Sequence, residues 1–187
     1  MVTVAQANAQ TAAPAETPQP ATGAPAPNAP SSSPPITWDR TANIKEAAVR
    51  IGTIQRTRGA EAAIKFIDAC YRTHGLASQY SAAFEGCIAQ DYLESKLLTR
   101  IYSRLPPEQL KKIGAPTADA IAQAMGRRVV AAFNQYKVGT VEAEAIRAEV
   151  DKHGFPVFLK TVFPNSASEI DGVTGKSDAN DQNKEKN

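Results

Sequence analysis

The two cysteines are the residues whose spacing most directly predicts a chemical bond. Cys70 and Cys87 are the only cysteines in the chain, and they lie in two segments with helical spacing of apolar residues, 60–74 and 81–104. The midpoint between the cysteines falls in the short loop that joins these segments. An antiparallel pair of helices would therefore bring the two sulfur atoms together. We predict a Cys70–Cys87 disulfide, with two buried free cysteines as the alternative.

Metal and cofactor chemistry finds little support in the sequence. The C-x-x-C spacing of redox-active cysteine pairs is absent. His74 follows Cys70 by one helical turn, but no second pair of ligands completes the four that zinc needs. The sequence has no phosphate loop, dinucleotide fingerprint or His-Glu-x-x-His motif. We therefore expect no metal site and no cofactor.

Charged residues in two helical segments are candidates for binding a ligand or a partner. Asp91 follows Cys87 by one helical turn. One possibility is a buried carboxylate with a raised pKa. We favour the other, in which Asp91 lies at the edge of the apolar stripe beside a lysine or arginine. Arg127 and Arg128 follow Gly126. Arginines bind phosphates and carboxylates bidentately, but we favour a solvated position for this pair, with Gly126 marking tight helix packing.

Tyrosines are the aromatic candidates for a binding pocket. Five of them are spaced as core or core-edge residues: Tyr71, Tyr80, Tyr92, Tyr102 and Tyr136. We favour packing in the core for all five. The alternative is a ligand pocket between segments 60–74, 81–104 and 118–137, because ligands of helical bundles bind between helices.

Helices separated by glycine and proline position these residues. Apolar periodicity predicts helices at 41–58, 60–74, 81–104, 108–113, 118–137 and 141–153. We expect Thr117 to be a helix N-cap, and Gly75 and Gly154 to end helices in the left-handed conformation. The last apolar segment, 155–163, is predicted to be a short helix or an extended strap, and we favour a place in the core over an exposed docking strip.

The predicted fold is all-α, a compact bundle of five to six helices with a disulfide across a helix hairpin. No alternating apolar pattern indicates a sheet. The bundle is expected to span residues 38–164, between disordered tails at 1–37 and 165–187. The first tail holds eight prolines and ten alanines, and the second is polar. Neither has enough large apolar side chains to offset the entropy lost on folding.

Charge and hydropathy narrow the range of partners and compartments. Segment 38–164 carries 18 Lys/Arg and 13 Asp/Glu without a run of five basic residues, so no nucleic acid is expected. No segment reaches the roughly 18 consecutive apolar residues of a membrane span. Ala7-Asn8-Ala9 fits the small-x-small pattern of a signal-peptide cleavage site, or matches it by chance in an alanine-rich tail. With the predicted disulfide, this pattern favours a periplasmic or secreted protein.

These observations do not identify one biochemical task. Our leading hypothesis is a non-enzymatic exported helical module that binds another protein or serves as a structural accessory. The alternative is a small-ligand binder with an aromatic pocket. A hydrolytic enzyme that uses Asp91 and a histidine is less favoured, because His74 and His153 each precede a predicted capping glycine. We predict no catalytic residue.

Overall fold

The computed structural model describes residues 36–166, and the predicted all-α fold is confirmed there, with no strand in this range. The predicted tails lie outside the described residues, apart from their innermost positions. The helices are α1 (Arg40–His74), α2 (Ala82–Tyr102), α3 (Pro107–Lys112), α4 (Ala118–Gln135), α5 (Thr140–Glu149) and α6 (Phe155–Val162). A π-helical turn, η1 (Val150–Gly154), joins α5 to α6, and a 3-10 turn, η2 (Pro164–Ser166), follows α6.

Helix α1 unites two of the predicted helices across a sharp bend. The bend lies at Gly59, whose φ of 79° and ψ of 177° are adopted almost only by glycine. The predicted boundary between 41–58 and 60–74 is therefore present as a change of direction. Asp39 begins α1 by accepting a hydrogen bond from the Ala42 amide at 3.0 Å, which satisfies one of the free amides of the first turn.

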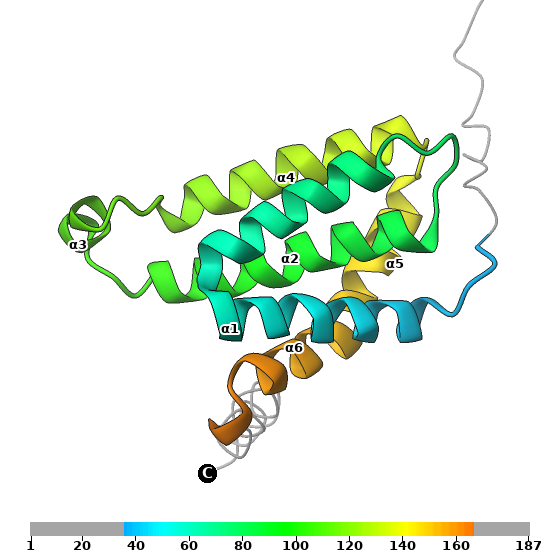
Figure 1. Ribbon diagram of the computed structural model, residues 1–187. Coiled ribbons are helices and arrows are strands. Elements are labelled where there is room, and N and C mark those ends of the chain that lie inside the picture. Colours follow the sequence, from blue (N-terminus) through cyan, green and yellow to red (C-terminus); the bar gives the residue numbers. More distant parts are fainter. Residues whose placement is uncertain (1–35, 167–187) are drawn as a thin grey trace, which may run out of the picture. The chain divides into compact units, whose positions relative to one another are not determined.

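Helix α2 lies between α1 and α4, and α6 packs against α1 (Figure 1). The short helix α3 projects from one end of the bundle (Figure 1). Because α2 has neighbours on opposite sides, it buries polar as well as apolar residues: Glu85, Gln90, Asp91, Glu94 and Ser95. Among the described residues, no helix is long and apolar enough to cross a membrane.

Segment 155–163, which was predicted to be either a short helix or an extended strap, forms helix α6. Phe155, Phe158, Leu159 and Val162 are buried, so the expectation that this segment completes the core is confirmed. The approach of α6 to α1 is close at Gly52, where a Cβ atom would lie 2.9 Å from the Cβ of Thr161. A larger residue at position 52 would push these two helices apart.

The left-handed conformation predicted for Gly75 and Gly154 is wrong, although Gly75 does end α1 as expected. Gly75 and Gly154 both have right-handed backbone angles, with φ of −72° and −80°. The chain remains helical through Gly154, from α5 through η1 into α6. Glycine is required there for space, because a Cβ at position 154 would lie 2.8 Å from Cγ2 of Ile44. The cap predicted at Thr117 is confirmed, since its Oγ1 accepts a hydrogen bond from the Ala120 amide.

Candidate functional site

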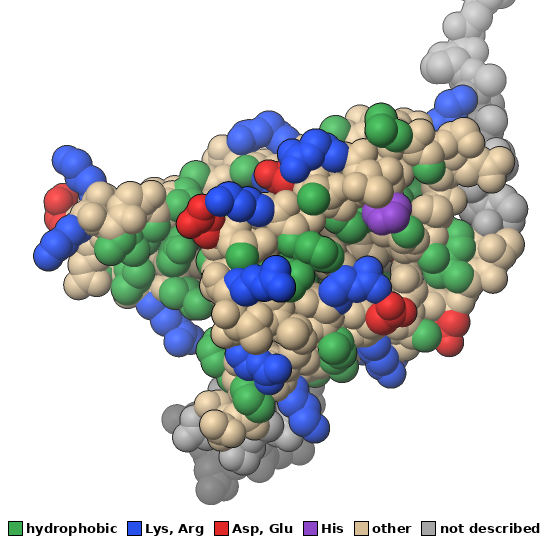
Figure 2. Space-filling model, in the orientation of Figure 1, with side chains coloured by type: hydrophobic (Ala, Val, Ile, Leu, Met, Phe, Trp, Pro, Cys, Tyr) green, Lys and Arg blue, Asp and Glu red, His purple; other side chains and the backbone are tan. Residues whose placement is uncertain are grey.

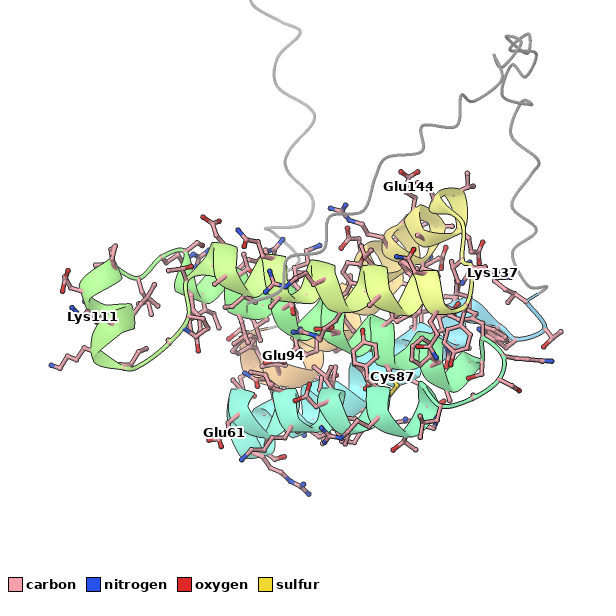
Figure 3. All side chains as sticks on the ribbon, turned by 90° about the horizontal axis from the view of Figure 1, so that it is seen from above. Glu61, Cys87, Glu94, Lys111, Lys137 and Glu144 are labelled. Carbon is pink, nitrogen blue, oxygen red and sulfur yellow. A yellow bond between two sulfur atoms is a disulfide. The ribbon has the colours of Figure 1, made fainter. Side chains whose placement is uncertain are left out.

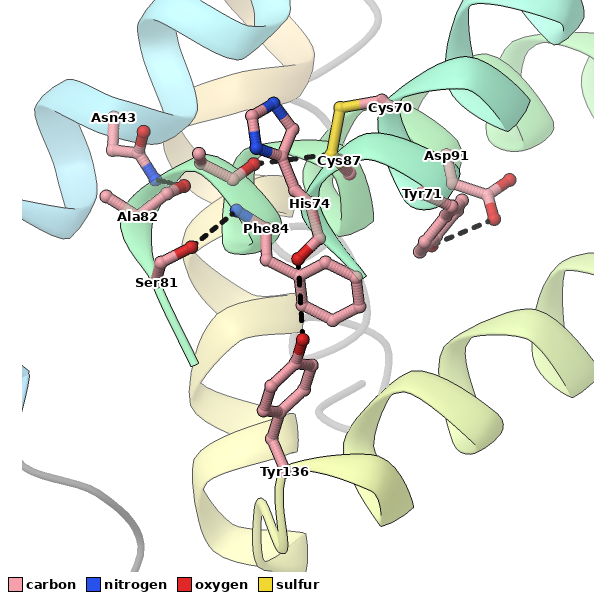
Figure 4. The surroundings of a disulfide bond; sticks show 11 residues. Asn43, Cys70, Tyr71, His74, Ser81, Ala82, Phe84, Cys87, Asp91 and Tyr136 are labelled. Carbon is pink, nitrogen blue, oxygen red and sulfur yellow. Dashed lines mark hydrogen bonds between the residues drawn. A yellow bond between two sulfur atoms is a disulfide. The ribbon is translucent and has the colours of Figure 1, made fainter. Parts of the chain in front are cut away.

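The predicted disulfide is present and links the second half of α1 to α2 (Figure 4). The Cα atoms of Cys70 and Cys87 lie 5.6 Å apart. His74 is close by, and one of its ring nitrogens and the two sulfur atoms all lie within 4.8 Å of one another. Because the sulfurs are bonded to each other, neither is a thiolate able to bind a metal ion.

Three acidic side chains are buried on α2, and the first of them, Glu85, is fully paired. It accepts hydrogen bonds from Trp38 Nε1 at 2.9 Å and Arg40 Nε at 3.0 Å, and Tyr80 Oη lies 3.4 Å from it. Arg40 also pairs with Glu142 on α5. Burial raises the pKa of Tyr80, and the charge of Glu85 adds to this. Glu85 therefore joins the starts of three helices as a structural centre.

The second buried acid, Asp91, lies in the interior instead of at the predicted edge of the stripe. Only 1% of it is exposed. It is nevertheless beside an arginine, as expected: Arg128 donates from Nε and Nη2 at 2.8 and 2.6 Å. Tyr71 and Ser95 add hydroxyl donors at 3.2 and 3.1 Å. The hydrogen bond to Asp91 raises the pKa of Arg128, and burial raises that of Tyr71.

The third buried acid, Glu94, has no hydrogen-bond partner on either carboxylate oxygen. It is 1% exposed and lies within the helical unit, whereas Glu61 and Glu144 lie on its outside (Figure 3). Burial raises the pKa of Glu94 to about 7. Gln90, one helical turn earlier, also has an unpaired Oε1. An unpaired buried carboxylate costs several kcal/mol, and a buried group with a perturbed pKa that lines a cleft is a candidate for a functional site.

Glu94 lines a pocket of about 200 Å³ between the second half of α1, α2 and α4. Most of the lining is apolar: Ile64, Ile67, Leu98, Tyr102, Pro116, Ala120, Ile121 and Ala124. Ser95 and four charged side chains also line it. Three of these are acids (Asp68, Asp91 and Glu94) and one is a base (Arg128). Since Arg128 is already bound to Asp91, the free binding capacity of the pocket lies in acceptor oxygens.

The structure brings together only some of the residues predicted to contact a ligand or partner. Asp91, Arg128 and Tyr102 line the Glu94 pocket, whereas Tyr92 lines a separate groove. Tyr136 packs against Phe84, with ring centroids 4.8 Å apart, and donates its hydroxyl to the Ala77 carbonyl at 3.0 Å.

Two other sequence predictions concern α4. Arg127 is exposed, and none of the residues the structure describes forms a salt bridge with it. A Cβ at Gly126 would meet no atom of another element within 4 Å. The expectation of tight packing at Gly126 is therefore wrong.

The sequence analysis did not single out Glu94. The feature that could have pointed to Glu94 is an acidic residue among the apolar residues Leu93, Leu97 and Leu98, on a helix that packs between two others.

The histidines do not join Asp91 in the part of the chain that the structure describes. His74 lies beside the disulfide, and Nε2 of His153 lies 3.8 Å from Oε2 of Glu149. The hydrogen-bond partners of Asp91 are instead Tyr71, Ser95 and Arg128. The chain matches no protein-family model, and no curated protein or solved structure matches it either.

Proposed function

We propose that this protein is a non-enzymatic binding protein whose pocket between α1, α2 and α4 holds a compact organic cation. The observation that carries this proposal is Glu94, a buried carboxylate that lines a mainly apolar pocket and has no hydrogen-bond donor on either oxygen. Proteins pair nearly all of their buried charges. The other two buried acids of α2 are paired with arginines, so Glu94 stands out on its own helix.

The chemistry of the lining favours a primary ammonium group on a small apolar body. An ammonium group has three donors and no acceptor, which complements the two free oxygens of Glu94. An anion would face three acids, and the arginine that might bind it is already occupied by Asp91. A volume of about 200 Å³ is below the roughly 300–1,000 Å³ of pockets for drug-sized ligands. The ligand is therefore compact, such as one aromatic ring or a short alkyl chain with an amine.

We further propose that the protein works in an oxidising compartment, in the periplasm or outside the cell. The support is the Cys70–Cys87 disulfide, since such bonds persist where glutathione and thioredoxin do not reduce them. A carrier or sensor of a small amine is compatible with that compartment. The protein-binding role favoured by the sequence would use a different surface, the hollow between α2, α4 and α5.

Calorimetric titration with benzylamine tests the ligand proposal on the full chain. At pH 8 Glu94 is mostly ionised, so benzylammonium is expected to bind with one-to-one stoichiometry. Benzyl alcohol, of nearly the same shape, is expected to bind more weakly, and benzoate not at all. Glu94→Gln keeps the shape of the side chain and removes its charge, and it should weaken benzylamine binding by about tenfold or more.

The control variant is Glu144→Gln, which makes the same chemical change at an exposed position away from the pocket. It should leave the affinity unchanged. Ala124→Leu, which adds volume inside the pocket, should abolish binding of both benzylamine and benzyl alcohol. Equal binding of benzylamine by wild type and Glu94→Gln, or equal binding of benzoate and benzylamine, would contradict the proposal.

A further inference from the structure

A second hollow lies between α2, α4 and α5, and it differs from the Glu94 pocket in size and openness. Its volume is about 630 Å³. Its floor is mainly apolar and comes largely from α4: Ala122, Met125, Gly126, Val129, Val130 and Phe133. We call this hollow the α4 groove. Such a long apolar depression beside a helix is the form of surface that accepts another amphipathic helix.

Within residues 36–166, no element covers one flank of α4. Helix α4 packs mainly against α2, and Val130 is 57% exposed on the flank that faces the groove. Gly126 lies one turn before Val130, and its missing side chain leaves open space there. In a helix interior glycine costs about 0.5–1 kcal/mol relative to alanine. Gly126 thus lowers helix stability at a position where a side chain would fill the groove.

The rim of the groove carries more positive than negative charge. Lys96, Arg100 and Arg147 line it together with a single acid, Asp151. Asp151 is paired with Lys96. Arg100 lies over the ring of Phe155 at 4.6 Å. Among residues 36–166 no carboxylate forms a salt bridge with Arg100 or Arg147, so two arginines flank the apolar floor with their charge unneutralised.

Several basic residues outside the groove are paired with acids or interspersed with other side chains. On the face shown in Figure 2, lysine and arginine side chains are separated by acidic, hydrophobic and uncharged atoms. Two of the basic side chains of α1 are neutralised by acids one turn away, in the pairs Glu46–Arg50 and Glu61–Lys65. In the α4 groove, by contrast, an apolar floor lies beside two arginines that form no salt bridge within residues 36–166.

We propose that the α4 groove binds an acidic amphipathic helix of a partner protein. The apolar side of that helix, with residues at i, i+3 or i+4, and i+7, lies against Met125, Val129 and Val130. Its acidic residues pair with Arg100 and Arg147. Charge complementarity selects this occupant: an amphipathic helix with basic flanks meets two unneutralised arginines, and an uncharged helix leaves them unpaired.

A displayed library of randomised peptides of about 15 residues, four helical turns, tests the proposal against the full chain. The expected enriched sequences have helical apolar spacing and net negative charge. A synthetic peptide of the enriched consensus is then titrated by fluorescence anisotropy against three variants. Gly126→Leu fills the groove and should weaken binding by about tenfold or more. Arg147→Glu should also weaken peptide binding, and this effect should be smaller at high salt concentration because salt screens the charges.

Gly126→Leu is not expected to unfold the protein, because leucine is a better helix former than glycine and meets open space. Gln123→Leu is the matched control: it adds the same side chain to an exposed position of α4 outside the groove, and it should leave affinity unchanged. Enriched peptides without an acidic bias would overturn the proposal. The proposal would also be overturned if Gly126→Leu left peptide affinity unchanged. It would equally be overturned if no peptide were enriched and the protein bound phosphatidylglycerol vesicles instead.

Discussion

Glu85, Asp91 and Glu94 are buried on one helix, yet only the first two are neutralised by arginines. Arg40 reaches Glu85 from α1, and Arg128 reaches Asp91 from α4. No base reaches Glu94, which is therefore destabilising when charged unless a ligand supplies the donor. This difference between neighbours on the same helix supports structural roles for Glu85 and Asp91 and is the basis of the binding role proposed for Glu94.

Glu94 should make the stability of the free protein depend on pH. Its pKa is about 7 in the folded protein and about 4.3 in an unfolded chain. The folded state thus binds the proton more tightly, and the free energy of unfolding falls as pH rises from about 4.5 to 7. Above pH 7 the accumulated loss is about 4 kcal/mol. In urea unfolding, Glu94→Gln should exceed wild type in stability at pH 8 and match it near pH 4.5. A stability difference that does not change with pH would contradict this assignment.

The Asp91–Arg128 pair should contribute to stability independently of any ligand. Arg128→Met leaves Asp91 buried with only the hydroxyls of Tyr71 and Ser95 as donors, at a cost of about 2 kcal/mol. In the double variant with Asp91→Asn the loss should be smaller than the sum of the single losses. Arg127→Met changes the exposed neighbour and should alter the free energy of unfolding by less than about 0.5 kcal/mol. Equal effects at positions 127 and 128 would show that the ion pair contributes nothing.

At the scale of the element, α1 depends on a single residue for its change of direction. The backbone angles of Gly59 are almost inaccessible to other residues, although a Cβ there would meet nothing within 4 Å. Gly59→Ala should therefore lower stability by about 2 kcal/mol through backbone strain alone. Gly126→Ala, which also meets open space but in a regular helix, should raise it by about 0.5–1 kcal/mol. Thermal unfolding of the two variants should shift in opposite directions, and shifts of the same sign would contradict the contrast.

Helix positions followed from the sequence because apolar spacing and the breaks at Gly59 and Pro106-Pro107 are local signals. The conformations of Gly75 and Gly154 did not follow, since both depend on what surrounds the helix end. Gly154 is held in a continuous helix because Ile44 of α1 lies against it, and that contact joins residues far apart in the chain. Ile64 belongs to the apolar stripe of segment 60–74, yet it is 46% exposed because it lines a pocket instead of a closed core.

At the scale of the whole molecule, the disulfide should contribute about 3 kcal/mol, since it closes a loop with a sequence separation of 17 residues. A variant with both Cys70→Ala and Cys87→Ala should lose about this amount in urea unfolding. Addition of a reducing agent should destabilise wild type to a similar degree and leave the variant unaffected. Unreduced, denatured wild type should show no free thiols on titration. Two free thiols, or no effect of reduction, would refute the bond.

The disulfide was predictable because both cysteines lie in neighbouring helices at equal distances from one loop. The candidate sites were harder to predict, because each is formed by three helices and the sequence does not give the relative positions of those helices. Asp91 and Arg128 were singled out separately, but nothing in their spacing paired them. Glu94 acquires its importance from the absence of a partner, which becomes visible only when all neighbours are placed.

The Cys70–Cys87 bond also determines how the described helices would respond to mechanical tension between the first and the last of them. A pulling force would pass through the sulfur atoms and bypass the 17-residue interval between the two cysteines. The oxidised chain would then extend about 50 Å less than the reduced chain when fully stretched. The end of α1 and the start of α2, residues 71–86, would bear no load, and Tyr71 and Tyr80 lie within this shielded segment.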